Sequence, residues 1–178
     1  MRKLFLTILF TTCYNLYSQN LFFIGDKSYP ATETFSLMDN NNFDENNMLG
    51  LSNLDVLIAK TKDGGGYLVL SKKTMTGVII RNKVLLYLDD GTVITCVDKG
   101  KYDYVDETST TIYSLNQQEL EKMKNSNLNT IRYSLKCGSG CQQSTEEGSF
   151  TASNKSREKY SVKIERIDVS SLINELFN

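Results

Sequence analysis

A short stretch near the middle of the chain predicts a β-hairpin around which the rest of the fold can be built. Its sequence, VLLYLDDGTVITCV, holds two apolar runs, Val84–Leu88 and Val93–Val97, separated by Asp89-Asp90-Gly91. Apolar runs on both sides of an Asp-Gly turn are typical of two paired antiparallel strands. A three-residue loop with its glycine in the left-handed region forms a type I turn with a G1 bulge.

The length of this turn decides which side chains share a face. With three loop residues, Leu86 lies opposite Ile94 and Val84 lies opposite Cys96, and one face is strongly apolar. A two-residue loop would shift the pairing by one position and mix apolar with polar side chains on both faces. We therefore predict the three-residue loop. Because the second face is also fairly apolar, we expect a central hairpin covered on both sides, with Cys96 in the core.

Further strands are predicted on both sides of this hairpin. A second hairpin is predicted from residues 54–61 and 67–72, around a turn with three consecutive glycines. Other strands are predicted at 20–24, 32–38, 108–113, 129–135 and 160–167, and polar loops at 39–52 and 142–148. Closely spaced turns in the middle of the chain predict an antiparallel meander.

Two short helices complete the predicted fold. Residues 116–124 begin with a capping box, in which Asn116 caps the helix and Glu119 reaches back to it. Asp168 is expected to cap a last helix at 169–177. Because no linker or shift in composition divides the chain, we predict one α+β domain. It should be antiparallel and β-rich, with a meander or sandwich-like sheet and both helices packed on it.

The first 18 residues predict a secretory signal peptide. A basic pair, a short apolar run and a more polar run follow one another in residues 2–18. We expect cleavage after Ser18 or Gln19 and a mature domain at 19–178, without a transmembrane segment. The alternative is a lipid anchor on Cys13, although the residues before it match a lipoprotein signal poorly. The protein is thus expected in the periplasm or outside the cell.

The composition excludes several kinds of chemistry. The chain has no histidine, which excludes Ser-His-Asp and Cys-His catalysis, histidine zinc sites and histidine pH switches. Without Arg2 and Lys3, 18 basic residues stand against 21 acidic ones, a net charge of −3. Such a chain is not expected to bind nucleic acid or anionic lipid. No cofactor is predicted.

The cysteines predict one disulfide. Cys137 and Cys141 enclose a Gly-Ser-Gly spacer that lets a very short loop close in an oxidising compartment. Cys96 would then be a buried free thiol. The alternative is a thiol or soft-metal site at Cys137 and Cys141. Against it, thioredoxin-like sites use a two-residue spacer at a helix N-terminus, and zinc would need a fourth ligand.

Acidic residues gather in the turns on either side of Val93–Val97. Asp89, Asp90, Asp98 and Asp103 could supply oxygen ligands for calcium if the fold brought them together. Their spacing matches no EF-hand, however, and Asp-Gly turns are ordinary in hairpins. The same carboxylates could form a glycosidase pair, which sequence alone does not reveal.

Tyrosine is the residue type that most favours a binding surface. The large amphipathic side chains of tyrosines suit contacts with proteins or sugars when they are partly exposed. Strands also favour tyrosine for packing alone. The candidates for a binding surface are Tyr67, Tyr87, Tyr102, Tyr104 and Tyr113.

These features together predict a secreted binding or interaction protein without enzymatic activity. Its partner would be a protein or a glycan outside the cytoplasm. One alternative is a carboxylate-dependent hydrolase that acts on extracellular glycans. Another is a thiol- or metal-handling protein that uses Cys137 and Cys141.

Overall fold

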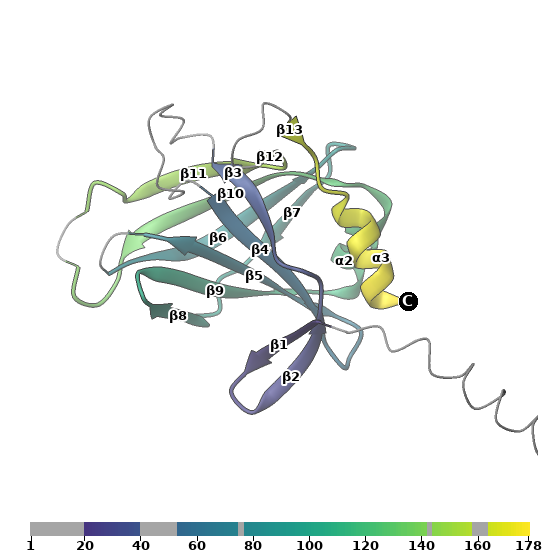
Figure 1. The fold of residues 1–178 in the computed structure, drawn as a ribbon, viewed down its shortest axis with the longest axis horizontal. Coiled ribbons are helices and arrows are strands. Elements are labelled where there is room, and N and C mark those ends of the chain that lie inside the picture. The colour runs from purple at the N-terminus through teal and green to yellow at the C-terminus, as the bar shows by residue number, and fades with distance from the viewer. Residues whose placement is uncertain (1–19, 40–52, 75–76, 142–143, 158–163) are drawn as a thin grey trace, which may run out of the picture.

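The computed structural model of the chain describes residues 20–39, 53–74, 77–141, 144–157 and 164–178 (Figure 1). The predicted signal peptide and nearly all of the predicted loop at 39–52 lie outside these ranges. The strands are β1 (Asn20–Ile24), β2 (Lys27–Ala31), β3 (Phe35–Asp39), β4 (Asn53–Lys60), β5 (Gly66–Lys73), β6 (Val78–Leu88), β7 (Val93–Cys96), β8 (Tyr102–Val105), β9 (Thr108–Leu115), β10 (Leu128–Cys137), β11 (Gly148–Ser153), β12 (Ser156–Arg157) and β13 (Ile164–Glu165). The helices are α2 (Gln117–Asn125) and α3 (Val169–Phe177). The predicted fold class, a β-rich α+β domain with two short helices, is confirmed.

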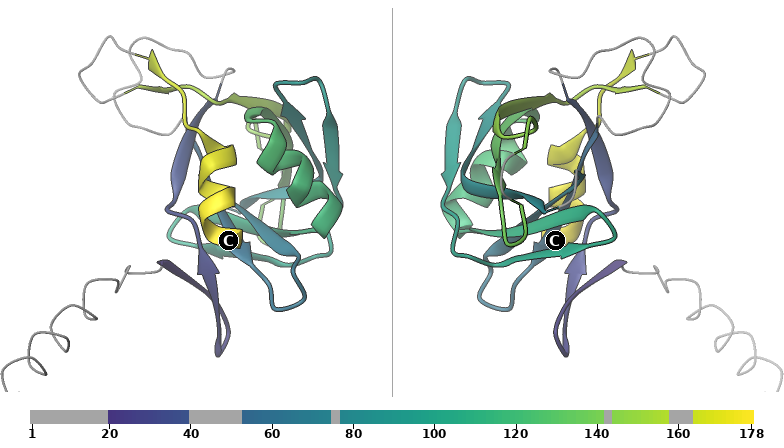
Figure 2. Two further views of the ribbon diagram at one scale, coloured as in Figure 1. Left: turned by 90° about the vertical axis from the view of Figure 1, so that its right-hand side faces the viewer. Right: turned by 90° about the vertical axis from the view of Figure 1, so that its left-hand side faces the viewer.

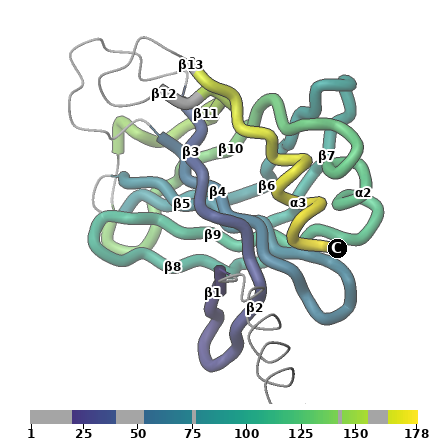
Figure 3. The backbone as a smooth tube through the Cα atoms, turned by 45° about the vertical axis from the view of Figure 1, so that its right-hand side comes forward, coloured from purple at the N-terminus to yellow at the C-terminus, as the bar shows by residue number. Residues whose placement is uncertain are grey.

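Eleven strands form one antiparallel sheet in the order β7-β6-β10-β11-β3-β4-β5-β9-β8, with β2 joined to β4 and β1 to β2. Strands β12 and β13 form a separate pair. The large sheet curls around the core, and the end-on views of Figure 2 show both helices side by side at one end of it. The β1–β2 hairpin projects from the body, as the tube in Figure 3 shows.

The curl brings β6 against β9, although the two strands are not neighbours in the sheet. The Ile80 amide donates a 2.8 Å hydrogen bond to the Ser109 hydroxyl, and the Thr111 hydroxyl donates one of 2.8 Å to the Ile80 carbonyl. These side chains are buried, so their hydroxyls satisfy main-chain groups that water cannot reach. The apolar core lies inside this curled sheet, closed at one end by the helices.

The predicted hairpin and its register are confirmed. Leu86 pairs with Ile94 and Val84 with Cys96, as the three-residue loop requires. Gly91 has a φ of 84°, in the left-handed region that favours glycine. The Leu88 amide donates to the Thr92 carbonyl at 2.9 Å. The predicted apolar face is buried throughout.

The expectation that this hairpin is central and covered on both sides is wrong. Strand β7 is an edge of the sheet; Val93 on its second face is 46% exposed, and Val97, directly after the strand, is 62% exposed. The predicted meander is also interrupted, because β5 pairs with β9 and β6 pairs with β10. Local sequence patterns predict hairpins well, but they do not show which distant strand pairs with the free edge of a hairpin.

The C-terminal part contains two strands that were not predicted, β11 and β12, and a predicted strand that ends earlier than expected, at Glu165. Strand β11 pairs with β10 from Thr130↔Ser153 to Leu135↔Gly148, but its sequence, GSFTAS, carries little apolar alternation. Of the strand predicted at 160–167, Ile164–Glu165 pairs with Ser156–Arg157, and residues 160–163 lie outside the described ranges. Pairing with a partner strand, rather than intrinsic preference, therefore decides strand formation here.

Both helices form as predicted. The Asn116 side chain accepts from the Glu119 amide at 2.9 Å, and Glu119 accepts from the Asn116 amide at 2.8 Å. This is the reciprocal capping box. At the second helix, the Asp168 carboxylate accepts from the Ser171 amide at 3.0 Å. Each helix buries its apolar side, with Leu120 and Met123 from α2 and with Val169, Ile173 and Leu176 from α3.

Candidate functional site

A solvent-open groove of ≈ 1380 Å³ lies where four parts of the chain meet. They are the turn and second strand of the β1–β2 hairpin, the β4–β5 turn, the end of β7 with the residues after it, and the junction of β9 and α2. Among the described lining residues only Val97 and Leu115 have aliphatic side chains. The rest of the lining is aromatic, hydroxyl, amide, charged or glycine, at 26–29, 61–63, 65–67, 95, 99, 114 and 116–119. The groove is therefore suited to a polar ligand.

Two tyrosines form the aromatic part of the groove. Tyr29 on β2 and Tyr67 on β5 pack edge to face, with ring centroids 5.3 Å apart and planes at 80°. The Lys101 ammonium lies 5.3 Å from the Tyr67 ring centroid, at the distance of a cation–π contact. Burial, with smaller contributions from Tyr29 and Asp63, raises the pKa of Tyr67. Its hydroxyl therefore stays protonated at neutral pH and can both donate and accept a hydrogen bond.

The β4–β5 turn is fixed against the start of α2. Gly64 has a φ of 81°, and the Gln117 side-chain amide donates to the Asp63 carbonyl at 2.9 Å. A Cβ atom at Gly65 would lie 2.9 Å from the Leu115 carbonyl oxygen. The glycines predicted to shape a hairpin turn thus also let it approach the β9–α2 junction closely. This contact forms one wall of the groove.

Two of the three carboxylates at the groove are already engaged within the protein. Asp63 accepts hydrogen bonds from the Thr61 hydroxyl and from the Gly65 amide, the latter at 3.3 Å. These bonds, led by the one from Thr61, lower the pKa of Asp63. Glu119 accepts from the Asn116 amide in the capping box. Both carboxylates therefore serve to hold the walls of the groove.

Only one of the predicted binding tyrosines lines the groove. Tyr67 does so, whereas Tyr102 is 46% exposed on β8, and Tyr87 and Tyr104 are half-buried on other strands. Tyr113 is fully buried and donates to the Asn82 carbonyl at 3.1 Å, so its assignment to a binding surface is wrong. Its side chain lies on the face of β9 that points into the core. The general preference of strands for tyrosine explains a tyrosine at this position.

Sequence reasoning missed Tyr29. Its position next to Tyr67 depends on the contact of β2 with β4 at Ala31↔Ala59 and on the pairing of β4 with β5. These strands bring together residues almost forty positions apart in the sequence. A local sequence pattern does not predict such a long-range contact. Tyrosine was nevertheless the right residue type to consider.

The four aspartates proposed for calcium do not converge on one point. In the parts of the chain that the structure describes, no group of three or more acidic or cysteine side chains could hold a metal ion. Asp98 lies 3.3 Å from the Arg81 guanidinium, and Asp103 accepts from the Tyr104 amide at 2.8 Å. The calcium prediction fails because the four carboxylates do not come together and are bound to different groups of the protein.

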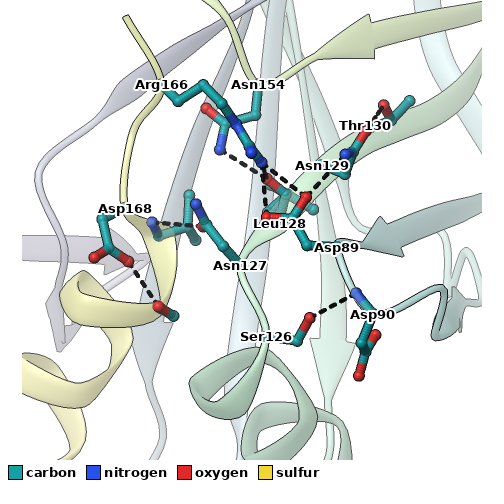
Figure 4. A network of polar contacts seen from close by, with 12 residues as sticks. Asp89, Asp90, Ser126, Asn127, Leu128, Asn129, Thr130, Asn154, Arg166 and Asp168 are labelled. Carbon is teal, nitrogen blue, oxygen red and sulfur yellow. Dashed lines mark hydrogen bonds and ion pairs between the residues drawn. The ribbon is translucent and has the colours of Figure 1, made fainter.

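Asp89 and Asp90 belong to a polar network that connects distant segments (Figure 4). Arg166 donates to both Asp89 carboxylate oxygens at 2.8 and 2.9 Å, and the Asn129 side-chain amide donates to Asp89 at 2.8 Å. These hydrogen bonds lower the pKa of Asp89, and the bond from Arg166 has the largest effect. The Asp90 amide donates to the Ser126 hydroxyl at 3.0 Å. The network ties the β6–β7 turn to β10 and to the segment before α3.

The cysteines lie as the disulfide prediction requires. The sulfur atoms of Cys137 and Cys141 are at bonding distance, and their Cα atoms are 5.2 Å apart, within the range of disulfides. Cys96 is a buried free thiol, 1% exposed. Burial raises its pKa to about 12, so the unreactive thiol form dominates at neutral pH.

No helix among the described residues is long and apolar enough to cross a membrane. Comparisons of the sequence with protein-family models and with curated proteins, and of the fold with solved structures, find no match.

Proposed function

We propose that this chain is an extracytoplasmic binding protein that holds a glycan in the groove between the β1–β2 hairpin and α2. The Tyr29–Tyr67 pair at an otherwise polar groove carries this proposal. A sugar ring offers both apolar C–H surface and many hydroxyls. Tyrosine rings with polar tips match such a ligand, and the surrounding amides and hydroxyls supply directional hydrogen bonds.

The state of the carboxylates favours binding over hydrolysis. A glycosidase needs one carboxylic acid with a raised pKa and a second carboxylate facing it across the substrate. In the groove, the pKa of Asp63 is lowered by its hydrogen bonds, and Glu119 is engaged with the Asn116 amide. These groups stabilise the walls and are poorly suited to donate a proton to a leaving group.

The proposed location rests on the N-terminal sequence and the cysteines. Residues 2–18 have the layout of a secretory signal. A cysteine pair at bonding distance is typical of proteins in oxidising compartments. Mass spectrometry of the native protein is expected to find an N-terminus at Gln19 or Asn20. A diacylglyceryl group on Cys13 would instead place the protein on a membrane.

Binding to a glycan array tests the proposed function. Purified residues 19–178 are expected to bind a subset of polysaccharides, and Tyr67→Ala is expected to weaken that binding at least tenfold, since large aromatic side chains dominate such contacts. Tyr87→Ala is the matched control, because Tyr87 is also half-buried but lies outside the groove. Thermal unfolding of both variants confirms that they are folded.

Two outcomes would contradict the proposal. Equal losses for Tyr67→Ala and Tyr87→Ala would show that the groove is not the site. A protein that binds no glycan on the array, but captures a polypeptide from the envelope fraction, would be an interaction protein of another kind.

A further inference from the structure

We infer that the glycan held in the groove is acidic, with carboxylate or sulfate groups along its chain. This inference rests on the proposed function and names the ligand class of the same groove. It follows from which charged groups at the groove are available to a ligand.

Three exposed lysines reach the groove from three separate parts of the chain. Lys27 lies on β2, Lys62 in the β4–β5 turn, and Lys99 follows β7. Within the described ranges none of the three forms a salt bridge with an acidic side chain. Their ammonium groups are therefore free to meet negative charges on a ligand, and their flexible stems can follow a polymer of variable shape.

The lysines lie next to the aromatic pair. Lys27 and Tyr29 are two residues apart on β2, and side chains two apart in a strand point to the same face. Lys62 lies within the β4–β5 turn that leads to Tyr67. Lys101, two residues after Lys99, already places its ammonium over the Tyr67 ring. A saccharide ring on these tyrosines would thus have cations on several sides.

The carboxylates at the groove differ in how far they are already bound to other groups of the protein. Among the described residues, Asp26, Asp63 and Glu119 line the groove together with the three lysines, and the Lys101 ammonium adds a fourth positive charge beside the Tyr67 ring. Asp63 and Glu119 already accept hydrogen bonds from the protein. Asp26 lies exposed in the β1–β2 turn, and Asp63 is also exposed but is held by the hydrogen bonds of its own turn. Direct contacts available to a ligand are therefore mostly with cations, although the whole chain has a formal net charge of −1.

Two pairs of polysaccharides that differ in charge test this inference. Polygalacturonate is compared with its methyl ester, and dextran sulfate with dextran. We expect the full mature chain to bind an acidic member at least tenfold more tightly than its neutral counterpart. Comparing the two acidic probes shows whether carboxylate or sulfate is preferred. Binding should also weaken with added salt, because exposed charges are screened within about 10 Å at 0.1 M ionic strength.

A charge-matched pair of triple variants separates the groove from the general surface. Lys27→Gln, Lys62→Gln and Lys99→Gln together should lower affinity for the acidic polysaccharide at least tenfold. The control combines Lys83→Gln, Lys136→Gln and Lys155→Gln, three exposed lysines outside the groove. It makes the same change in net charge and should leave the affinity within about twofold.

Three other outcomes would contradict the inference, and they differ in what they say about the proposed function. Equal binding of neutral and acidic members, still lost in Tyr67→Ala, would overturn the acidic ligand but leave the glycan groove standing. Equal losses in the two triple variants would show unspecific attraction and overturn the inference. A chain that binds none of these polysaccharides, and no other glycan on the array, would overturn the proposed function as well.

Discussion

The Lys72 ammonium lies 3.2 Å from the Asp39 carboxylate inside the domain, where the two side chains are 4% and 0% exposed. The Tyr133 hydroxyl donates to the same carboxylate oxygen, and burial is the main cause that raises the pKa of Tyr133. These residues come from β5, β3 and β10. The ion pair therefore joins β5 to β3, and the Tyr133 hydrogen bond adds β10 to the same buried contact.

Removing the cation of this pair is expected to destabilise the fold strongly. Lys72→Met should lower the free energy of unfolding by about 3–5 kcal/mol, because it removes the Lys72 charge that lies beside the buried Asp39 carboxylate. Urea unfolding followed by circular dichroism measures this difference.

The matched variant combines Lys72→Met with Asp39→Asn. It removes both charges but keeps an acceptor for the Tyr133 hydroxyl, so it should recover at least half of the lost stability. If the double variant is no more stable than Lys72→Met, the loss comes from packing and not from an uncompensated charge.

The two faces of the β6–β7 hairpin should respond differently to the same substitution. Leu86 is 0% exposed and Leu85, its neighbour, is only half-buried on the other face. Leu86→Ala should cost about 2–5 kcal/mol, because it leaves a cavity in the core. Leu85→Ala should cost clearly less. Equal costs in chemical denaturation would mean that the register is wrong.

Loss of the Cys137–Cys141 pair should weaken the protein without unfolding it. The double change to serine should cost about 1–3 kcal/mol, since so short a loop restricts the unfolded chain only modestly. A lower melting temperature with unchanged circular dichroism is the expected result. Thiol labelling of the native wild type should find no reactive cysteine, and denaturation should expose Cys96. Two rapidly labelled thiols in the native state would contradict the disulfide.

Cys96 should make the fold less stable at alkaline pH. The unfolded chain loses the cysteine proton near pH 9, whereas burial raises the pKa of native Cys96 to about 12. Between these values the native state binds more protons than the unfolded state, so stability falls as pH rises. The loss due to Cys96 should reach about 2 kcal/mol at pH 10.5.

Cys96→Ala provides the comparison for this effect. Tyr113 and Tyr133 also have raised pKa values, so wild type and variant should both lose stability above pH 10. The wild type should lose more between pH 8 and pH 10.5. Parallel stability curves for the two proteins would show that the thiol does not titrate as described.

The sequence by itself determined the local structure of this protein. The Asp89-Asp90-Gly91 turn set the pairing of Leu86 with Ile94, and Asn116 with Glu119 set the start of α2. Both signals are read within a few residues, because turns and caps depend on nearby main-chain groups. The β-rich α+β class followed from the same local patterns.

Only the tertiary structure decided which strands are neighbours and where the groove lies. Pairing of β5 with β9 and of β6 with β10 joins segments separated by many residues, and alternation along one strand does not identify its partner. Tyr29 meets Tyr67 through such pairings, while Tyr113, of the same residue type, is buried. Residue type suggested tyrosines as candidates, but long-range packing determined which of them line the groove.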